Sequence, residues 1–179
     1  EMLDRGEIDR IAVLCPPHLC DQWQAELSEK FHIEAEVVRP GTISKLERDL
    51  QPSESIFGVY PHLVISIDYI KSDRRRDDFI NECPEFVIVD EAHTCSAGAS
   101  QSSSQQRRHA LLRDLMKSGE RHLVLATATP HSGIETAFRS LLELLDPAFA
   151  DLPVEGRIEA SHPLRQKLAQ HFVQRRRAD

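Results

Sequence analysis

Two carboxylates and a histidine follow a short apolar run near the middle of the chain. Asp90, Glu91 and His93 come directly after the stretch Phe86-Val87-Ile88-Val89. This stretch predicts a buried parallel strand, because it is apolar on both faces and contains β-branched residues. Open α/β sheets bind ligands at the carboxyl ends of such strands. Adjacent carboxylates there suit metal-assisted phosphoryl transfer, in which one acid holds Mg²⁺ through its water shell and the other polarises the attacking water.

A second apolar segment lies about one βα unit downstream and ends in hydroxyl groups. Residues 123–126 are apolar, and they are followed by Thr127, Ala128, Thr129 and Pro130. Two adjacent acids are common in proteins, so Asp90 and Glu91 alone are weak evidence for phosphoryl transfer. The interpretation depends on both segments together. We expect both strand ends to meet at one rim of a sheet, where they could handle a triphosphate.

The rest of the chain alternates apolar runs with amphipathic stretches, which is the pattern of βαβ units in a parallel sheet. Strands are expected over residues 11–15, 35–39, 63–67, 86–90 and 123–127, and helices near 18–30, 43–50, 73–81 and 106–118. A further helix is expected after Ser132, which with Glu135 forms an S-x-x-E capping box, and Asp146-Pro147 should end it. Residues 150–163 are expected to be irregular, followed by a helix near 163–176.

These motifs resemble the first RecA-like lobe of SNF2-type superfamily 2 ATPases. Asp90-Glu91-Ala92-His93 matches the DEAH form of the Walker B box, and Thr127-Ala128-Thr129-Pro130 matches motif III. The order is also that of the family, with likenesses to motif Ia at 11–23, to motif Ib at 64–69 and to the exit arginines at 172–177. The string TATPHSG at 127–133 favours the bacterial branch near the RNA-polymerase-associated ATPase, with a phage-defence helicase of that branch as an alternative.

The resemblance implies a three-layer RecA-like fold of the P-loop NTPase type, with a parallel sheet and helices on both faces. Residues 1–149 would be the ATP-binding lobe, and 150–179 would lead toward a second lobe. No G-x-x-x-x-G-K-[ST] phosphate loop occurs in the sequence. We therefore expect an N-terminally truncated piece of a longer ATP hydrolase, which alone would bind ATP weakly and hydrolyse none.

The resemblance also implies residue roles. Asp90 would orient Mg²⁺ through a water, and Glu91 would be the general base toward ATP. His93 would hydrogen-bond Thr127 or Thr129 and so couple the nucleotide site to motif III. The implied partners are nucleic acid, with double-stranded DNA favoured, and a second RecA-like lobe of the same chain. Candidate nucleic-acid contacts are Pro16, His18, Ser66, Lys71, Arg175 and Arg176.

Other interpretations stay open. The parent could be a strand-separating DEAH helicase or a restriction-type motor subunit, or the lobe could be a non-catalytic scaffold. Trp23 is read as a core residue rather than a base-stacking platform, and Arg74-Arg75-Arg76 as a solvated helix face paired with neighbouring aspartates. The polar stretch from Ser96 to Gln106 is read as a flexible loop, more a spacer than a nucleic-acid contact.

Composition sets the remaining bounds. The 179 residues are 40% hydrophobic and 28% charged, which is ordinary for one globular domain. The net charge of −7 argues against non-specific nucleic-acid binding by the whole surface, although a local basic track remains compatible with it. No apolar run reaches membrane-spanning length. The four cysteines form no C-x-x-C pair, so reduced thiols in a cytoplasmic protein are favoured over a zinc site at Cys15, His18 and Cys20.

Overall fold

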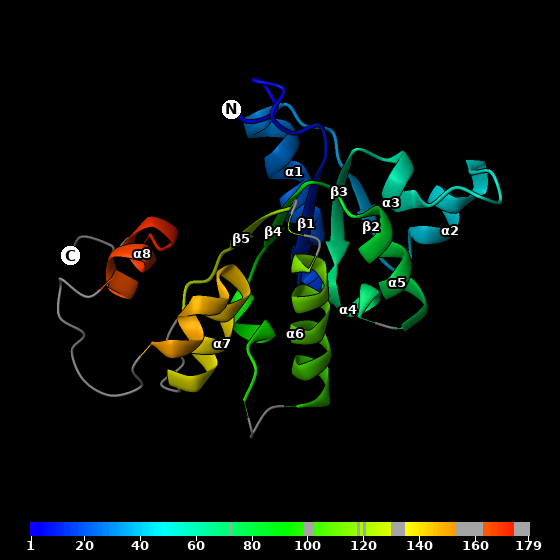
Figure 1. Cartoon of the computed structure of the whole chain (residues 1–179). Helices are drawn as coiled ribbons and strands as arrows, with labels where there is room; N and C mark the ends of the chain where they lie inside the picture. Colours follow the sequence, from blue (N-terminus) through cyan, green and yellow to red (C-terminus); the bar gives the residue numbers. More distant parts are fainter. Residues whose placement is uncertain are drawn as a thin grey trace.

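The backbone forms a five-stranded, all-parallel sheet in the computed structural model, which describes residues 1–71, 73–98, 102–117, 119, 121–129, 135–152 and 163–173. The strand order is β2-β3-β1-β4-β5. Figure 1 shows the strands side by side with helices packed around them. The strands are β1 (Ile11–Cys15), β2 (Glu36–Val38), β3 (His62–Ser66), β4 (Phe86–Val89) and β5 (His122–Leu125).

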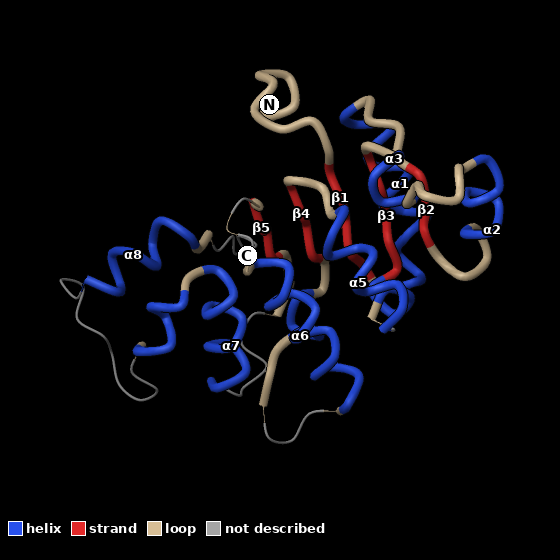
Figure 2. The backbone as a smooth tube through the Cα atoms, turned by 45° about the vertical axis from the view of Figure 1, so that its right-hand side comes forward, coloured by secondary structure: helices blue, strands red, loops and turns tan. Residues whose placement is uncertain are grey.

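Helices connect the strands and follow the last of them. The α-helices are α1 (Cys20–Phe31), α2 (Ile43–Leu46), α3 (Ile56–Val59), α4 (Ile67–Ile70), α5 (Asp73–Glu82), α6 (Ser103–Met116), α7 (Glu135–Leu145) and α8 (Pro163–His171). Four 3₁₀ turns complete the described elements: η1 (Pro17–Leu19), η2 (Glu47–Asp49), η3 (Ala92–Cys95) and η4 (Pro147–Asp151). In Figure 2, α7 and α8 lie at the β5 end of the sheet.

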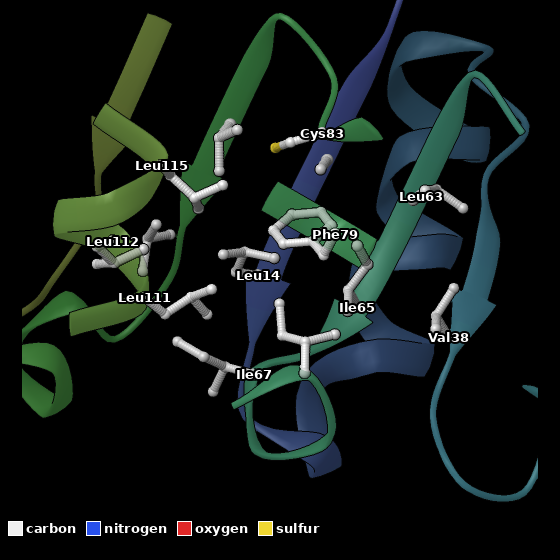
Figure 3. Close-up of a cluster of buried hydrophobic side chains, with 14 of the residues drawn as sticks. Leu14, Val38, Leu63, Ile65, Ile67, Phe79, Cys83, Leu111, Leu112 and Leu115 are labelled. Atoms are coloured by element: carbon white, nitrogen blue, oxygen red, sulfur yellow. The ribbon is translucent and has the colours of Figure 1, made fainter. Parts of the chain in front are cut away.

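An apolar cluster covers each face of the sheet, and one cluster is larger than the other. Alternate residues of β1 point to opposite faces: Leu14 joins the larger apolar cluster, and Val13 joins the smaller one beneath α1. Figure 3 shows the larger cluster, in which side chains of the helices lie over those of the strands: Phe79 from α5, Leu111, Leu112 and Leu115 from α6, and Leu14 and Ile65 from β1 and β3. The expected α/β fold with helices on both faces is confirmed.

Most expected elements occur within two residues of their expected ends, but the stretch after the acidic motif differs. Helix α6 begins at Ser103, so the last four residues of the expected loop from Ser96 to Gln106 are helical. Ser102 accepts a hydrogen bond from the Gln105 backbone, and the Gln105 side chain accepts one from the Ser102 backbone. This S-x-x-Q capping box starts the helix. The expected box at Ser132 lies outside the described residues.

The arginine cluster of α5 also differs from expectation. Arg75 pairs with Glu47 of η2 and lies over the ring of Tyr69, and Arg76 pairs with Asp114 of α6. Both arginine side chains are less than a quarter exposed. The prediction of a solvated face with sequence-local pairs was therefore wrong for these two residues, because neighbouring elements supply their carboxylates.

Arg10 connects the amino ends of β1 and β4 to two helices. Its backbone N–H and its Nε donate to the Glu85 carboxylate, at 2.9 and 3.1 Å. The remaining guanidinium nitrogens donate to the carbonyl oxygens of Phe57, Glu82 and Cys83, at 3.2 to 3.3 Å. One side chain thus satisfies backbone acceptors at the ends of α3 and α5 that would otherwise lack a donor.

Replacing Arg10 with alanine is expected to lower the free energy of unfolding by about 2–3 kcal/mol, because three backbone carbonyls lose their guanidinium donor and the half-buried Glu85 carboxylate keeps only the backbone N–H of residue 10. Urea denaturation followed by circular dichroism measures this loss. Arg5→Ala is the matched control: its pair with Glu1 is exposed, so its loss should cost less than about 0.5 kcal/mol. Equal effects of the two substitutions would contradict a structural role for Arg10.

None of the helices within the described ranges has both the length and the apolar character needed to cross a lipid bilayer.

Candidate functional site

The strand ends that carry the candidate residues lie at one edge of the sheet. In the parallel register, Cys15 pairs with Ser66, Leu14 with Val89, and Val89 with Leu125. The segments that follow β1, β3, β4 and β5 therefore leave the sheet at the same rim. This confirms the expectation that the acidic motif and the threonine-rich tip converge.

Backbone hydrogen bonds fix the acidic motif between its two neighbouring strands. The Asp90 N–H donates to the Leu14 carbonyl at 2.8 Å, on the β1 side. The Ala92 N–H donates to the Ala126 carbonyl at 2.9 Å, on the β5 side. The sheet ladder thus continues past the end of β4 in both directions. Asp90 and Glu91 are held as part of the sheet edge rather than on a free loop.

Glu91 has an unusual backbone conformation for a residue with a side chain. Its φ of 50° and ψ of 44° place it in the left-handed region. In this region the Cβ of an L-residue is crowded by the backbone, at a cost of about 1 kcal/mol or more. The bonds on either side hold it there, and the 3₁₀ turn η3 starts directly afterwards. At this turn the chain leaves the direction of β4. The Glu91 side chain is half-buried at the rim.

This conformation predicts an inverted order of stability between two substitutions. Glu91→Gly should be more stable than Glu91→Ala by about 1 kcal/mol, because glycine adopts positive φ without the Cβ clash. At the exposed helical position Glu29 the order should be the usual one, with glycine about 1 kcal/mol less stable than alanine. Urea midpoints of the four variants test this. Alanine equal to or better than glycine at position 91 would contradict the left-handed geometry.

Both oxygens of Asp90 have protein donors. Oδ1 accepts from the Glu91 N–H at 2.8 Å, and Oδ2 accepts from the indole Nε1 of Trp23 at 2.8 Å. Each carboxylate oxygen has a further lone pair, so Asp90 can still accept a hydrogen bond from a metal-bound water. Two adjacent carboxylates also fit Mg²⁺, which prefers oxygen ligands and is held by one or two acids together with substrate phosphates.

Trp23 has a role that sequence reasoning missed. Its ring packs partly buried against the smaller apolar cluster, as expected for a core residue, but its N–H donates to the Asp90 carboxylate. The position of Trp23 on an apolar stripe of α1 did not predict this contact, because Trp23 and Asp90 are 67 residues apart in the sequence. A polar N–H on a half-buried aromatic usually finds an acceptor, and this rule indicates only that some partner exists.

His93 connects the acidic motif to the threonine-rich strand tip. Its Nδ1 lies 3.1 Å from Thr127 Oγ1 and 3.1 Å from Glu91 Oε2. A carboxylate only accepts hydrogen bonds, so its closeness favours the tautomer with the proton on Nδ1. Thr127 Oγ1 in turn accepts the backbone N–H of Thr129 at 3.2 Å. The expected contact between His93 and motif III is confirmed, with Thr127 as the partner.

The candidate nucleic-acid residues are only partly presented at the surface. His18 is exposed on η1, and Pro16 is half-buried. Ser66 differs from the expectation, because it is 1% exposed and its hydroxyl is not presented to a ligand. Lys71 donates to Asp68 Oδ1 and to Ser104 Oγ, each at 2.8 Å. Arg175 and Arg176 lie outside the described residues.

Asp68 holds two cations beside the motif Ib strand. It accepts from Lys71 and from Nε of Arg108, the latter at 3.1 Å across 40 residues. Burial alone would raise the pKa of Asp68, but the hydrogen bonds from Lys71 and Arg108 bring that pKa below its ordinary value. Arg108 is a positively charged neighbour of Lys71 that sequence reasoning missed, because it belongs to α6 and not to a motif.

A groove of about 570 Å³ borders the β5 tip. Its walls are mostly apolar and come from β5, α7 and residues 171–173. Thr127 and Ala128 of the threonine-rich strand tip are among its lining residues. Apolar walls do not suit a triphosphate, so this groove is a poorer candidate for a phosphate site than the sheet edge that carries Asp90 and Glu91.

No group of three histidine, cysteine, aspartate or glutamate side chains within the described ranges is arranged to hold a metal ion. Cys15, His18 and Cys20, the zinc ligands considered from the sequence, lie within these ranges and form no such group.

Curated proteins with similar sequences include an ATP-dependent helicase and two RNA polymerase-associated proteins. The uncharacterized ATP-dependent helicase YqhH of Bacillus subtilis (strain 168) is 31% identical over 148 residues, which is 82% of this chain and 22% of that protein. The RNA polymerase-associated protein RapA of Stutzerimonas stutzeri is 28% identical over 151 residues, and that of Erwinia tasmaniensis 24% over 149, each covering 82% of this chain. The chain spans 15% of either RapA, so it corresponds to a small part of these relatives.

A solved structure has the same fold. The Sulfolobus solfataricus SWI2/SNF2 ATPase core in complex with double-stranded DNA matches with a TM-score of 0.56 and 16% identity, over 82% of this chain and 27% of that one. The family match is more extensive: residues 3–154 match the SNF2-related domain. By this match, and by the motif order and the rim geometry above, the chain belongs to the SNF2-related domain family.

Proposed function

We propose that this chain is part of the ATP-binding motor lobe of a cytoplasmic SNF2-like translocase, which couples ATP hydrolysis to movement on double-stranded DNA. The observation that carries the proposal is the contact of one nitrogen, His93 Nδ1, with both Glu91 and Thr127, each at 3.1 Å. Through this contact Glu91, the proposed general base, is connected to Thr127 at the end of β5. The double-stranded DNA in the related Sulfolobus structure supports the choice of nucleic acid.

In this proposal each residue of the rim has one task. Bound Mg²⁺ would supply charge neutralisation on the triphosphate. Asp90, held by Trp23 and by its own backbone, orients the water shell of the ion. Glu91 accepts a proton from the attacking water at its carboxylate. The fixed turn at Glu91 keeps that carboxylate at the rim, so little rearrangement is needed before proton transfer.

His93 is proposed to transmit the state of the nucleotide site to motif III. If Glu91 changes its hydrogen bonds when phosphate arrives, His93 Nδ1 loses one of its two partners, and Thr127 must adjust. Thr127 also holds the Thr129 backbone, so the adjustment reaches the loop beyond β5. Coupling of this kind requires two discrete arrangements of the loop, with different affinities for nucleic acid.

The test is ATP hydrolysis by the full-length parent protein, measured with and without duplex DNA. The proposal expects stimulation by duplex DNA, displacement of a third strand from a triplex, and no separation of the duplex strands. Separation of strands would instead support the strand-separating helicase or restriction-type motor. Absence of hydrolysis with and without nucleic acid would overturn the proposal in favour of the non-catalytic scaffold.

A further inference from the structure

Two thiols face each other where β1 passes into α1. The Sγ atoms of Cys15 and Cys20 are 3.6 Å apart, and both side chains are fully buried. Cys15 is the last residue of β1 and Cys20 the first of α1, with the turn η1 between them. At 3.6 Å the sulfurs are in hydrogen-bond contact, and a disulfide would require them to approach to about 2.05 Å.

The surroundings make the two thiols chemically unequal. Cys20 lies at the amino end of a twelve-residue helix, where the helix dipole favours a thiolate. The hydrogen bond between the thiols lowers the pKa of Cys20 and raises that of Cys15, and the charge of nearby Arg39 lowers the pKa of Cys20 further. Arg39 is held in place by two hydrogen bonds to Asp21, at 2.9 and 3.0 Å. Cys20 is thus the nucleophile of the pair, and Cys15 is the proton donor.

The other two cysteines have no partner thiol of this kind. Cys83 and Cys95 are also buried, and burial raises the pKa of the Cys83 thiol to about 12 and that of Cys95 to about 11. Neither has a second cysteine within hydrogen-bond reach among the described residues. They are therefore internal controls, equally hidden from solvent but with burial as the dominant influence on the thiol pKa and without a resolving partner.

We propose that Cys15 and Cys20 form a redox-active dithiol, which a hydroperoxide converts into a reversible disulfide that spans the motif Ia turn. The Cys20 thiolate attacks one peroxide oxygen, the O–O bond breaks, and the departing oxygen leaves as water after protonation. Cys20 becomes a sulfenic acid. Cys15 sulfur then attacks Cys20 sulfur, the S–O bond breaks, and the Cys15 proton leaves with the hydroxide as water. The two sulfurs lose two electrons in total, and hydrogen peroxide is reduced to two waters.

Access to the buried pair depends on the turn that covers it. Pro17 and His18 of η1 are exposed, and the turn has no fully buried residue. The Cys20 thiol also donates to the carbonyl of Pro16, the residue before the turn, at 3.8 Å. Brief opening of this single turn admits a small peroxide. Once formed, the disulfide joins the end of β1 to the start of α1 and restricts the same turn.

Trypsin separates the two kinds of cysteine, which makes the experiment direct. Cleavage after Arg10 and Lys30 gives peptide 11–30 with Cys15 and Cys20, and cleavage after Arg76 and Arg107 gives peptide 77–107 with Cys83 and Cys95. The folded chain is treated with hydrogen peroxide, denatured in an alkylating reagent and analysed by mass spectrometry. The expected result is loss of two hydrogens and of both alkylation sites in peptide 11–30, reversed by a dithiol reductant, with both sites of peptide 77–107 retained.

Single substitutions assign the two roles. Cys15→Ser should stop the reaction at a Cys20 sulfenic acid that dimedone traps, Cys20→Ser should abolish it, and Cys95→Ser should leave the disulfide yield unchanged. The wild-type result stands on its own if a variant fails to fold. Peptide 11–30 keeping both alkylatable thiols, or peptide 77–107 losing its thiols at the same rate, would overturn the proposal. This test needs neither nucleotide nor DNA, so its outcome is independent of the proposed motor function.

Discussion

Glu91→Gln in the full-length parent protein is expected to retain ATP binding and to lose about 10²–10⁴-fold in turnover. This loss corresponds to about 3–5 kcal/mol of activation barrier, the contribution of a positioned general base. Glutamine keeps the size of the side chain and a carbonyl oxygen that can face His93 Nδ1, but it cannot accept a proton from water. The measurement is the steady-state rate of phosphate release, with ATP affinity followed separately by a fluorescent nucleotide.

The matched control is Glu36→Gln. Glu36 is an exposed acid at the start of β2, on the edge of the sheet opposite to the rim, so its turnover should equal that of the wild type. Loss of ATP binding together with turnover in Glu91→Gln would assign Glu91 to binding instead of proton transfer. Unchanged turnover would show that another group accepts the proton, and the role given to Glu91 would be wrong.

Phe79→Ala is expected to lower the free energy of unfolding by about 3–5 kcal/mol. Phe79 is fully buried on α5 and meets Phe57 of α3 edge-to-face, with ring centroids 5.0 Å apart at 68°. Removing the ring deletes apolar contacts with the sheet and leaves a cavity that the surrounding side chains can fill only partly. Such a loss is a large part of the stability of a typical domain.

Urea denaturation measures this effect, with the fluorescence of the single tryptophan, Trp23, as a probe of the opposite face. Phe31→Ala is the control, because Phe31 is 64% exposed and its loss should cost less than about 0.5 kcal/mol. If the two substitutions had equal effects, the packing of α5 on the sheet would be contradicted. A change seen by circular dichroism but not by Trp23 would indicate that the two faces unfold separately.

The strands were predictable because the information for them is local. Central parallel strands are buried on both faces and therefore appear as unbroken apolar runs, as residues 11–15 and 86–89 do. The convergence of the acidic and threonine-rich motifs was predictable for a related reason, since parallel strands end at one edge. The helix start at Ser102 was also readable from its S-x-x-Q spacing, although the surrounding run of serines favoured a loop.

What the sequence could not provide were contacts between residues far apart along the chain. The bond from Trp23 to Asp90 and the pairing of Arg108 with Asp68 each depend on how a helix is rotated against the sheet. Local periodicity gives the apolar face of a helix but not the partner of each polar group at its border. The same limit explains the error on Arg75, whose partner Glu47 lies on another element.

The sequence by itself determined the α/β class, the strands and the residues of the carboxylate rim, since these follow from hydrophobic runs and from the order of motifs. Only the tertiary structure decided the left-handed turn at Glu91, the partners of His93 and the closeness of Cys15 to Cys20. The physical reason is that the backbone angles of a residue at a strand end, and the distances from its side chain to other residues, depend on the neighbouring strands. For Glu91 the neighbours are β1 and the residue that follows β5: the carbonyls of Leu14 and Ala126 accept hydrogen bonds from the backbone on both sides of Glu91.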